Sequence, residues 1–196
     1  MTDLDRPASA LPGVRYGAVV RHADSRGSFR ELWRASAYPT NGLPAALAGI
    51  DGSRFVQANL SVSAAGVLRG VHYHRRQLDR WIVASGVAFV ALVDVRAASA
   101  SRGPAIVETR DLEADEWVEI PAGVGHGFLA RQPLELVYLV TAEFDDSDEL
   151  GFAWDDPAVG VPWPLPIAGT PDGRPILSDR DRTNPSLAEL VARLRD

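Results

Sequence analysis

Short stretches in which apolar and polar residues alternate follow one another through most of the chain, separated by Gly, Pro or charged turns. Alternation with a period of two, rich in β-branched and aromatic residues, is typical of β-strands. The pattern predicts strands at residues 14–20, 29–33, 55–61, 67–74, 81–85, 87–95, 105–112, 116–120, 127–130 and 134–141.

Eight of these strands lie between residues 55 and 144 with no helix between them, which predicts an all-β fold, an antiparallel sandwich or jelly roll. Beyond them, the apolar spacing Leu187, Leu190, Val191 and Leu194 predicts a short C-terminal helix. We expect one domain over residues 1–196. Its parts are N-terminal strands and a loop at 1–54 with at most a short helix at 43–48, a barrel core at 55–144, and an extended cover with the helix at 145–196.

Composition narrows the class of protein. The net charge of −6 argues against a general affinity for nucleic acid or an anionic membrane surface. The absence of Cys excludes disulfides and thiolate sites and suits a reducing compartment. Without a signal-like N-terminus or a run of membrane-spanning length, we expect a cytoplasmic protein. Solvated surface is expected at Arg30, Arg34, Arg75, Arg76, Arg102 and the acidic run 145–149.

The stretch from Gly66 to His74 carries the densest candidate chemistry. In a strand, His72 and His74 point to one face and Val71 and Tyr73 to the other. Two neighbouring imidazoles pack poorly in an apolar core, so we expect the face that carries them to line a cavity.

One interpretation of the histidines is a metal site. His72, His74, Asp79 and His126 follow the spacing of the two cupin motifs. Three imidazoles and a carboxylate inside a barrel would suit Fe, Mn, Ni or Zn, as in a metal-dependent cupin oxygenase. However, Ala130 replaces the usual final Asn of the second motif, and no other feature requires a metal.

A second interpretation is acid–base chemistry without a metal. His72 has a side chain suited to proton abstraction near neutral pH, given a carboxylate to fix its tautomer. Tyr138 is a phenol in an otherwise apolar strand, so its hydroxyl needs a partner or a cavity. A weak base and a weak acid across a cavity would suit the transfer of a proton from one face of a carbon to the other.

A third set of residues is suited to a nucleotide. Arg26 and Arg69 each precede a glycine, and a guanidinium beside an approachable backbone suits phosphate. Phe29 offers a ring for stacking on a base, and Glu31 an acceptor for its N–H.

Taken together, these residues resemble the dTDP-4-dehydrorhamnose 3,5-epimerase family, sugar-nucleotide epimerases built as an antiparallel jelly-roll (cupin) barrel. The resemblance extends over most of the chain. The matching segments are Asp24–Gly27, Phe55–Asn59, Gly66–Tyr73, Val93–Arg96, Ile120–Phe128, Trp154–Pro157, Val161–Pro164 and Pro175–Asp181.

The resemblance implies a dTDP-4-keto-6-deoxyhexose as substrate, epimerised at C3, C5 or both, with no cofactor and no metal. It assigns the base to His72, its carboxylate partner to Asp181 and the acid to Tyr138. It also implies a homodimer with exchanged N-terminal strands and no nucleic-acid or membrane partner. Expected substrate contacts are Gln57, Asn59 and Arg69 at the diphosphate and sugar, Arg26 from the partner chain, Phe29, Glu31 and Phe144 at the thymine, and His126 at the sugar.

Two departures from the family pattern concern the substrate pocket. Asp79 stands where the family typically has a Lys, and His74 where it often has Gln. Arg80 would replace the Lys only if a register shift or bulge turned it inward. Two further alternatives are therefore a 4-keto sugar-nucleotide ketoisomerase and a nucleotide-sugar binding protein with a degenerate site.

Overall fold

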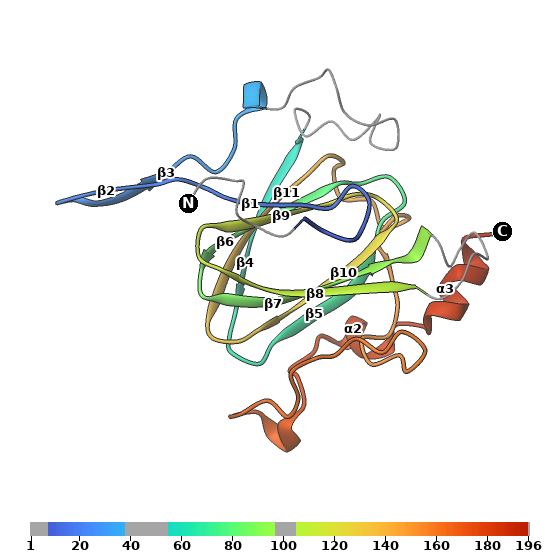
Figure 1. Cartoon of the computed structure of the whole chain (residues 1–196). Helices are drawn as coiled ribbons and strands as arrows, with labels where there is room; N and C mark the ends of the chain where they lie inside the picture. Colours follow the sequence, from blue (N-terminus) through green and yellow to red (C-terminus); the bar gives the residue numbers. More distant parts are fainter. Residues whose placement is uncertain (1–7, 38–54, 97–104, 196) are drawn as a thin grey trace.

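The computed structural model of the chain describes residues 8–37, 55–96 and 105–195. Ten strands form two five-stranded antiparallel sheets (Figure 1). The first sheet contains β1 (Arg15–Ala18), β9 (Glu116–Ile120), β6 (Asp79–Ser85), β11 (Leu134–Val140) and β4 (Gln57–Ser63), in that order. The second contains β12 (Leu150–Gly151), β5 (Leu68–Tyr73), β10 (Val124–Ala130), β7 (Val87–Asp94) and β8 (Ile106–Glu113).

This arrangement confirms the predicted all-β antiparallel jelly roll. The predicted strands from residue 55 onward are present, with ends shifted by a few residues; β10 begins three residues before the predicted start. The predicted helix at 43–48 lies outside the described residues, as does Arg102. None of the helices in the described ranges is long and apolar enough to cross a bilayer.

Both faces of the second sheet are buried. On β7, Val90 and Leu92 pack between the sheets, while Ala91 and Val93 pack on the opposite face. That outer cluster is completed by side chains from the C-terminal segment, including Phe152. Apolar residues at consecutive positions of β7 therefore reflect burial on both sides.

The C-terminal segment is fixed by two short helices. The predicted helix is α3 (Leu187–Arg193), which begins with a capping box between Ser186 and Glu189 and buries Leu187 and Leu190. The other helix, α2 (Asp179–Thr183), was not predicted, because its sequence DRDRT has no apolar periodicity. The described residues also contain two 3-10 turns, η2 (Ala35–Ala37) and η5 (Pro171–Gly173).

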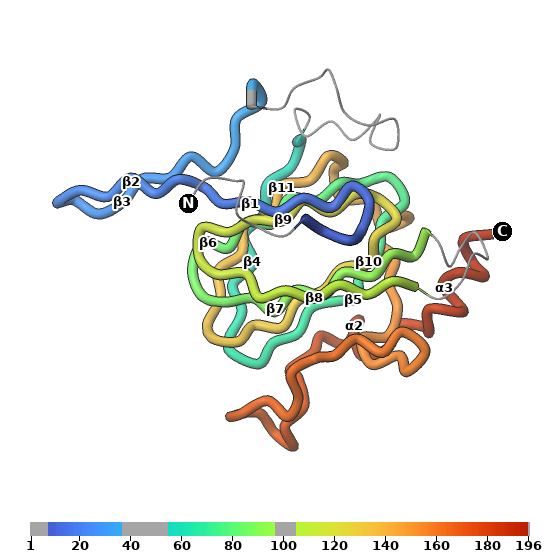
Figure 2. Tube along the Cα trace, in the orientation of Figure 1, coloured from blue at the N-terminus to red at the C-terminus, as the bar shows by residue number. Residues whose placement is uncertain are grey.

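A hairpin of β2 (Arg21–Asp24) and β3 (Gly27–Arg30) projects away from the two sheets (Figures 1 and 2). The predicted strand at 29–33 is wrong at its C-terminal end, because β3 stops at Arg30, where its partner β2 begins. No strand within the described residues pairs with the positions just beyond Arg30, so the alternation of aromatic and charged residues there does not produce a strand.

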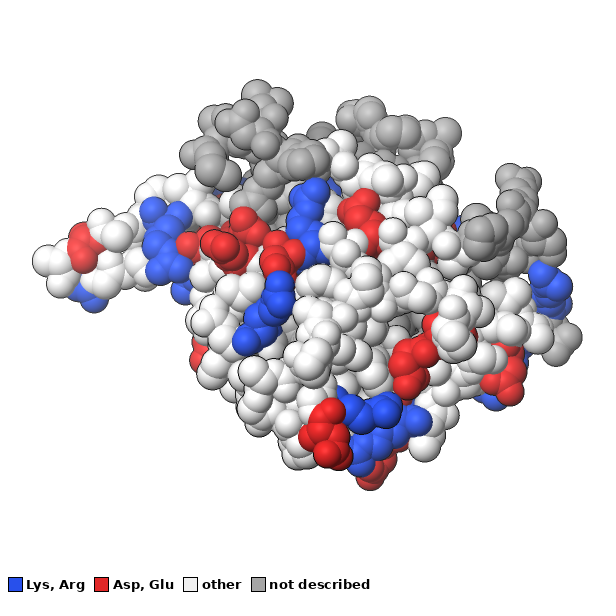
Figure 3. All heavy atoms as spheres, turned by 60° about the horizontal axis from the view of Figure 1, so that its bottom comes forward, with Lys and Arg blue, Asp and Glu red and all other residues white. Residues whose placement is uncertain are grey.

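Charges on the surface lie in mixed groups. On the face shown in Figure 3, acidic and basic side chains stand next to one another with uncharged surface between the groups. The expectation of no nucleic-acid partner stays a prediction.

Candidate active site

The two faces of β5 differ as predicted, because one is packed in an apolar cluster and the other lines a cavity. Val71 and Tyr73 are buried in the outer apolar cluster, while His72 and His74 line a cavity of about 430 Å³ between the sheets. The cavity is also lined by the sequence-predicted residues Arg69, His126, Tyr138 and Phe144.

Close contact between β5 and β10 brings the histidines together. Gly70 has a φ of +122°, and a Cβ there would lie 2.7 Å from the Cα of Gly127. Because neither residue has a side chain, the two strands approach closely and pair His72 with His126. The rings of these histidines have centroids 6.4 Å apart.

The imidazole of His72 is hydrogen-bonded to a carboxylate. Its Nε2 lies 2.9 Å from Oδ1 of Asp181, a residue of α2 that is 4% exposed. Burial acts to raise the pKa of Asp181, but hydrogen bonds from His72, Ser178 and the Gly70 backbone outweigh it and lower that pKa. The charged carboxylate accepts the Nε2 proton, so the neutral ring keeps its lone pair on Nδ1.

Tyr138 lies on the first sheet, across the cavity from His72 on the second. Burial, followed by the negative charges of Asp79 and Glu149, raises the pKa of the Tyr138 phenol. The hydroxyl therefore keeps its proton at neutral pH and is able to donate it. The structure thus places an imidazole and a protonated phenol on opposite walls of one cavity.

The predicted polar residues of β4, Gln57 and Asn59, do not line the cavity, but each neighbours a residue that does. The Gln57 amide nitrogen donates to Oδ1 of Asn59, and the Gln57 side-chain oxygen accepts from the backbone N–H of Phe144. Both distances are 3.0 Å. Asn59 is the register partner of Tyr138. Phe144 is 64% exposed and lines the cavity, as does Arg69 on the opposite sheet.

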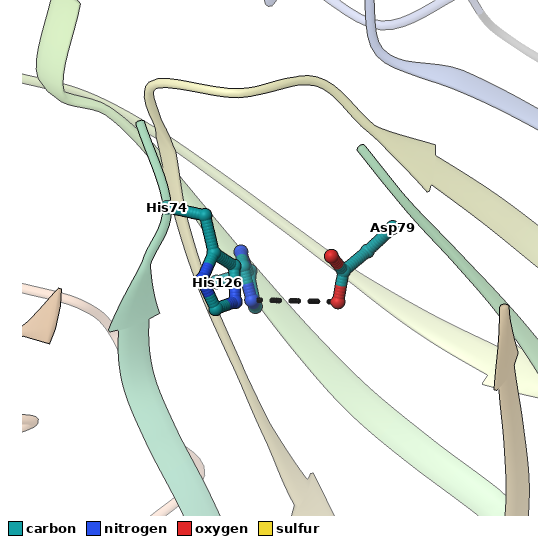
Figure 4. Close-up of side chains that lie close together, drawn as sticks. All are labelled: His74, Asp79 and His126. Carbon is teal, nitrogen blue, oxygen red and sulfur yellow. Dashed lines mark ion pairs between the residues drawn. The ribbon is translucent and has the colours of Figure 1, made fainter. Parts of the chain in front are cut away.

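A second group of titratable residues lies deeper in the same cavity. His74, Asp79 and His126 are buried, and one potential ligand atom from each lies within 4.8 Å of the others (Figure 4). His126 Nε2 is 3.8 Å from Asp79 Oδ2. Burial lowers the pKa of His126 to about 4, so its ring is neutral at pH 7. His72 is not part of this group. Of the four metal ligands considered from the sequence, the structure therefore brings only three together.

Arg80 does not take the place of the family's Lys. β6 pairs without a bulge at this point, with Arg80 opposite Glu119 and Leu139. Strand alternation turns its side chain away from the cavity, where it pairs with Glu119 at 2.9 Å and stacks 4.0 Å from the Trp117 ring centroid. Asp79 therefore faces the cavity instead, and the sequence contains no lysine.

Besides Gln57 and Asn59, three predicted substrate contacts lie outside the cavity of this chain. Arg26 is exposed at the tip of the hairpin, where it pairs with Asp24. Phe29 and Glu31 line a separate cavity of about 360 Å³, on which Arg80 also lies. Within one chain these residues are not brought together with His72, and the expected contribution of Arg26 from a partner stays a prediction.

The prediction that the acidic run 145–149 is solvated surface is wrong for Asp148. This carboxylate is 6% exposed and accepts hydrogen bonds from the backbone N–H and guanidinium of Arg75 and the backbone N–H of Arg76. Its own carbonyl lies 3.0 Å from His74 Nδ1. The run thus positions a histidine of the cavity.

Sequence reasoning missed the polar Gln77 in the cavity wall and two charged residues, Glu149 and Arg180. The two charged residues form an ion pair with each other, and Glu149 lies 3.6 Å from His74. Charged residues in polar segments carry no sequence signal that separates a cavity wall from open surface.

Comparison with known proteins places these features in a family. The sequence matches the family described as dTDP-4-dehydrorhamnose 3,5-epimerase over residues 8–189. It is 36% identical over 194 residues to the dTDP-4-dehydrorhamnose 3,5-epimerase of Streptomyces griseus, covering 96% of this chain and 88% of that protein.

Solved structures give the same result. The RmlC epimerase of Mycobacterium tuberculosis has a TM-score of 0.76 at 33% identity, covering 94% of this chain and 89% of that one. ChmJ, a 3'-monoepimerase from Streptomyces bikiniensis in complex with dTDP-quinovose, has a TM-score of 0.74 at 28% identity, covering 96% and 90%. With a family match across nearly its whole length, the chain belongs to the dTDP-4-dehydrorhamnose 3,5-epimerase family.

Proposed function

We propose that the chain is an isomerase that epimerises a dTDP-4-keto-6-deoxyhexose at C3, C5 or both. The observation that carries the proposal is the placement of His72, backed by Asp181, and Tyr138 on opposite walls of one cavity. Its volume of about 430 Å³ is within the range of small-molecule sites. Family membership and the dTDP-quinovose complex of ChmJ support this class of substrate.

The chemistry follows from the ketone. A carbonyl at C4 acidifies the hydrogens on C3 and C5, because the carbanion left behind is stabilised as an enolate. Nδ1 of His72 removes one hydrogen as a proton, and Asp181 stabilises the imidazolium that forms. The Tyr138 hydroxyl then gives its proton to the other face of the same carbon. Both side chains return to their starting states by proton exchange with water, and no redox change occurs.

Substrate binding would use the residues around the mouth of the cavity. Arg69 offers a guanidinium to the diphosphate and Phe144 a ring to the thymine, with Gln57 and Asn59 adding amide groups. We also propose a homodimer in which the partner subunit's Arg26 reaches this cavity. The projecting hairpin with its exposed tip supports that arrangement.

The test is solvent deuterium incorporation into dTDP-4-keto-6-deoxyglucose, followed by NMR at C3 and C5. We expect exchange at one or both carbons, together with an inverted product. A carbonyl that has moved to C3 would assign a ketoisomerase instead. Unimpaired dTDP binding without exchange at either carbon would assign a binding protein and overturn the proposal.

A further inference from the structure

We propose that His74, Asp79 and His126 bind one divalent first-row transition-metal cation in the cavity (Figure 4). None of the three is the proposed base or acid. His126 is also an expected sugar contact, and the group shares its cavity with His72 and Tyr138. Cation binding nevertheless needs neither proton-transferring group, so it and the proposed epimerisation are tested independently.

Hydrogen bonds fix the tautomers of both imidazoles. Nδ1 of His126 lies 3.0 Å from the Val124 carbonyl oxygen, and Nδ1 of His74 lies 3.0 Å from the Asp148 carbonyl oxygen. A carbonyl only accepts, so each Nδ1 carries a proton and each neutral ring has its lone pair on Nε2. A backbone carbonyl behind Nδ1 is the usual support for a metal-bound imidazole.

The two Nε2 atoms face acceptors rather than donors. His126 Nε2 is 3.8 Å from Asp79 Oδ2, and His74 Nε2 is 3.6 Å from Glu149 Oε1. Both distances exceed those of N–H···O hydrogen bonds. A cation placed between a lone pair and a carboxylate oxygen would satisfy both atoms.

Asp79 is itself oriented by donors. Its two oxygens accept from Gln77 Nε2 at 2.7 Å and from the indole Nε1 of Trp81 at 3.2 Å. The carboxylate is 4% exposed, and a buried charge is costly without a compensating one. Arg80, the next residue, points to the opposite face of the sheet and pairs with Glu119.

The donor set defines the class of cation. Two imidazole nitrogens and one carboxylate oxygen suit Zn²⁺, Fe²⁺, Co²⁺ or Mn²⁺ and leave coordination positions open. Atoms that share such an ion at about 2.1 Å lie roughly 3 to 4 Å apart, so the 4.8 Å span requires only a small inward movement. Glu149, whose Oε1 lies 3.6 Å from His74 Nε2, is placed to add a further oxygen.

The test is titration of the chelator-treated full chain with Co²⁺, followed by visible absorption and by metal content after equilibrium dialysis. We expect one Co²⁺ per chain and an affinity reduced by more than about 100-fold in Asp79→Asn and His126→Asn. The matched controls are His22→Asn, an exposed histidine on the hairpin, and His72→Asn; both should bind Co²⁺ as the unaltered chain does. Equal binding by all four variants, or no binding by the unaltered chain, would overturn the proposal.

A measurement on the unaltered protein guards against variants that fail to fold. Coordination through Nε2 leaves both Nδ1–H groups in place, so ¹H NMR of the Co²⁺ form should show two strongly shifted, slowly exchanging N–H signals. Their absence in a Co²⁺-saturated sample would reject the assigned ligands. Deuterium exchange measured on the same samples separates the two proposals: exchange without metal binding rejects only the cation site, and metal binding without exchange rejects only the epimerisation.

Discussion

His72 and Asp181 are 109 residues apart in the sequence and joined by a 2.9 Å hydrogen bond in the structure. The strand that carries the histidine belongs to the barrel, whereas the aspartate belongs to the short helix α2 of the C-terminal segment. The proposed base is therefore assembled from two parts of the chain, and each can be tested separately.

Replacing His72 by Asn should abolish deuterium exchange, with a loss of about 10³-fold or more, because an amide side chain has no basic nitrogen to accept the proton. The affinity for dTDP should change little, since the nucleotide is proposed to contact other residues. Exchange by NMR and calorimetric binding of dTDP are the measurements. Exchange retained at the normal rate would exclude His72 as the base.

Asp181→Asn should slow exchange by about 10²- to 10⁴-fold, because an amide can no longer stabilise the imidazolium or fix the proton on Nε2. Single-turnover exchange rates at saturating substrate measure this. His22→Asn, far from α2 on the projecting hairpin, serves as the control and should exchange normally.

The lowered pKa of Asp181 also predicts a pH dependence of stability. The folded-state pKa lies below the unfolded value near 4, so the contribution to stability is full above that value and is lost as the pH falls through the folded pKa. The free energy of unfolding, measured with urea, should fall less between pH 7 and a pH below 4 in Asp181→Asn than in the unaltered chain. Equal acid losses would contradict this.

Tyr138→Phe should slow product formation more than the first proton removal, because it deletes the acid and leaves the base in place. Wash-out of deuterium from substrate, compared with the appearance of inverted product, separates the two steps. The raised pKa of Tyr138 further predicts that product formation in the unaltered enzyme does not decline through phenol ionisation below about pH 10. Equal slowing of both steps in the variant would argue against Tyr138 as the acid.

Gly70→Ala should destabilise the fold more than Gly27→Ala. Both glycines have positive φ, at +122° and +132°, so both replacements introduce backbone strain of about 1–2 kcal/mol. Only at Gly70 does the new Cβ meet backbone atoms, 2.7 Å from Gly127 Cα, whereas at Gly27 nothing lies within 4 Å. Urea unfolding should show that Gly70→Ala lowers the free energy of unfolding by about 3 kcal/mol or more. Equal losses of unfolding free energy in the two variants would mean that β5 and β10 can move apart at little cost.

Period-two alternation was sufficient to predict the strands between residues 55 and 141 and the shared face of His72 and His74, because it depends only on local backbone geometry. The same rule placed Arg80 opposite to Asp79 unless a bulge intervened, and the irregularity in the pairing of β6 with β11 lies elsewhere, between Glu135 and Leu136. Asp148 could not be identified, because its burial depends on donors from Arg75 and Arg76, more than 70 positions earlier.

The helix α2 escaped prediction for a related reason. It has only five polar residues and begins at Ser178, whose side chain accepts the Asp181 backbone N–H. Its position beside β5 comes from tertiary contacts that no local pattern contains. The family resemblance pointed to Asp181, but only the folded chain shows what holds it in place.

The origin of Asp181 in the C-terminal segment has a consequence during synthesis. A ribosome completes the barrel strands well before it reaches α2. A nascent chain could therefore enclose the cavity while His72 still lacks its carboxylate partner, Asp181. Catalytic competence would therefore arise only when the segment that carries α2 has been translated and has docked on the barrel.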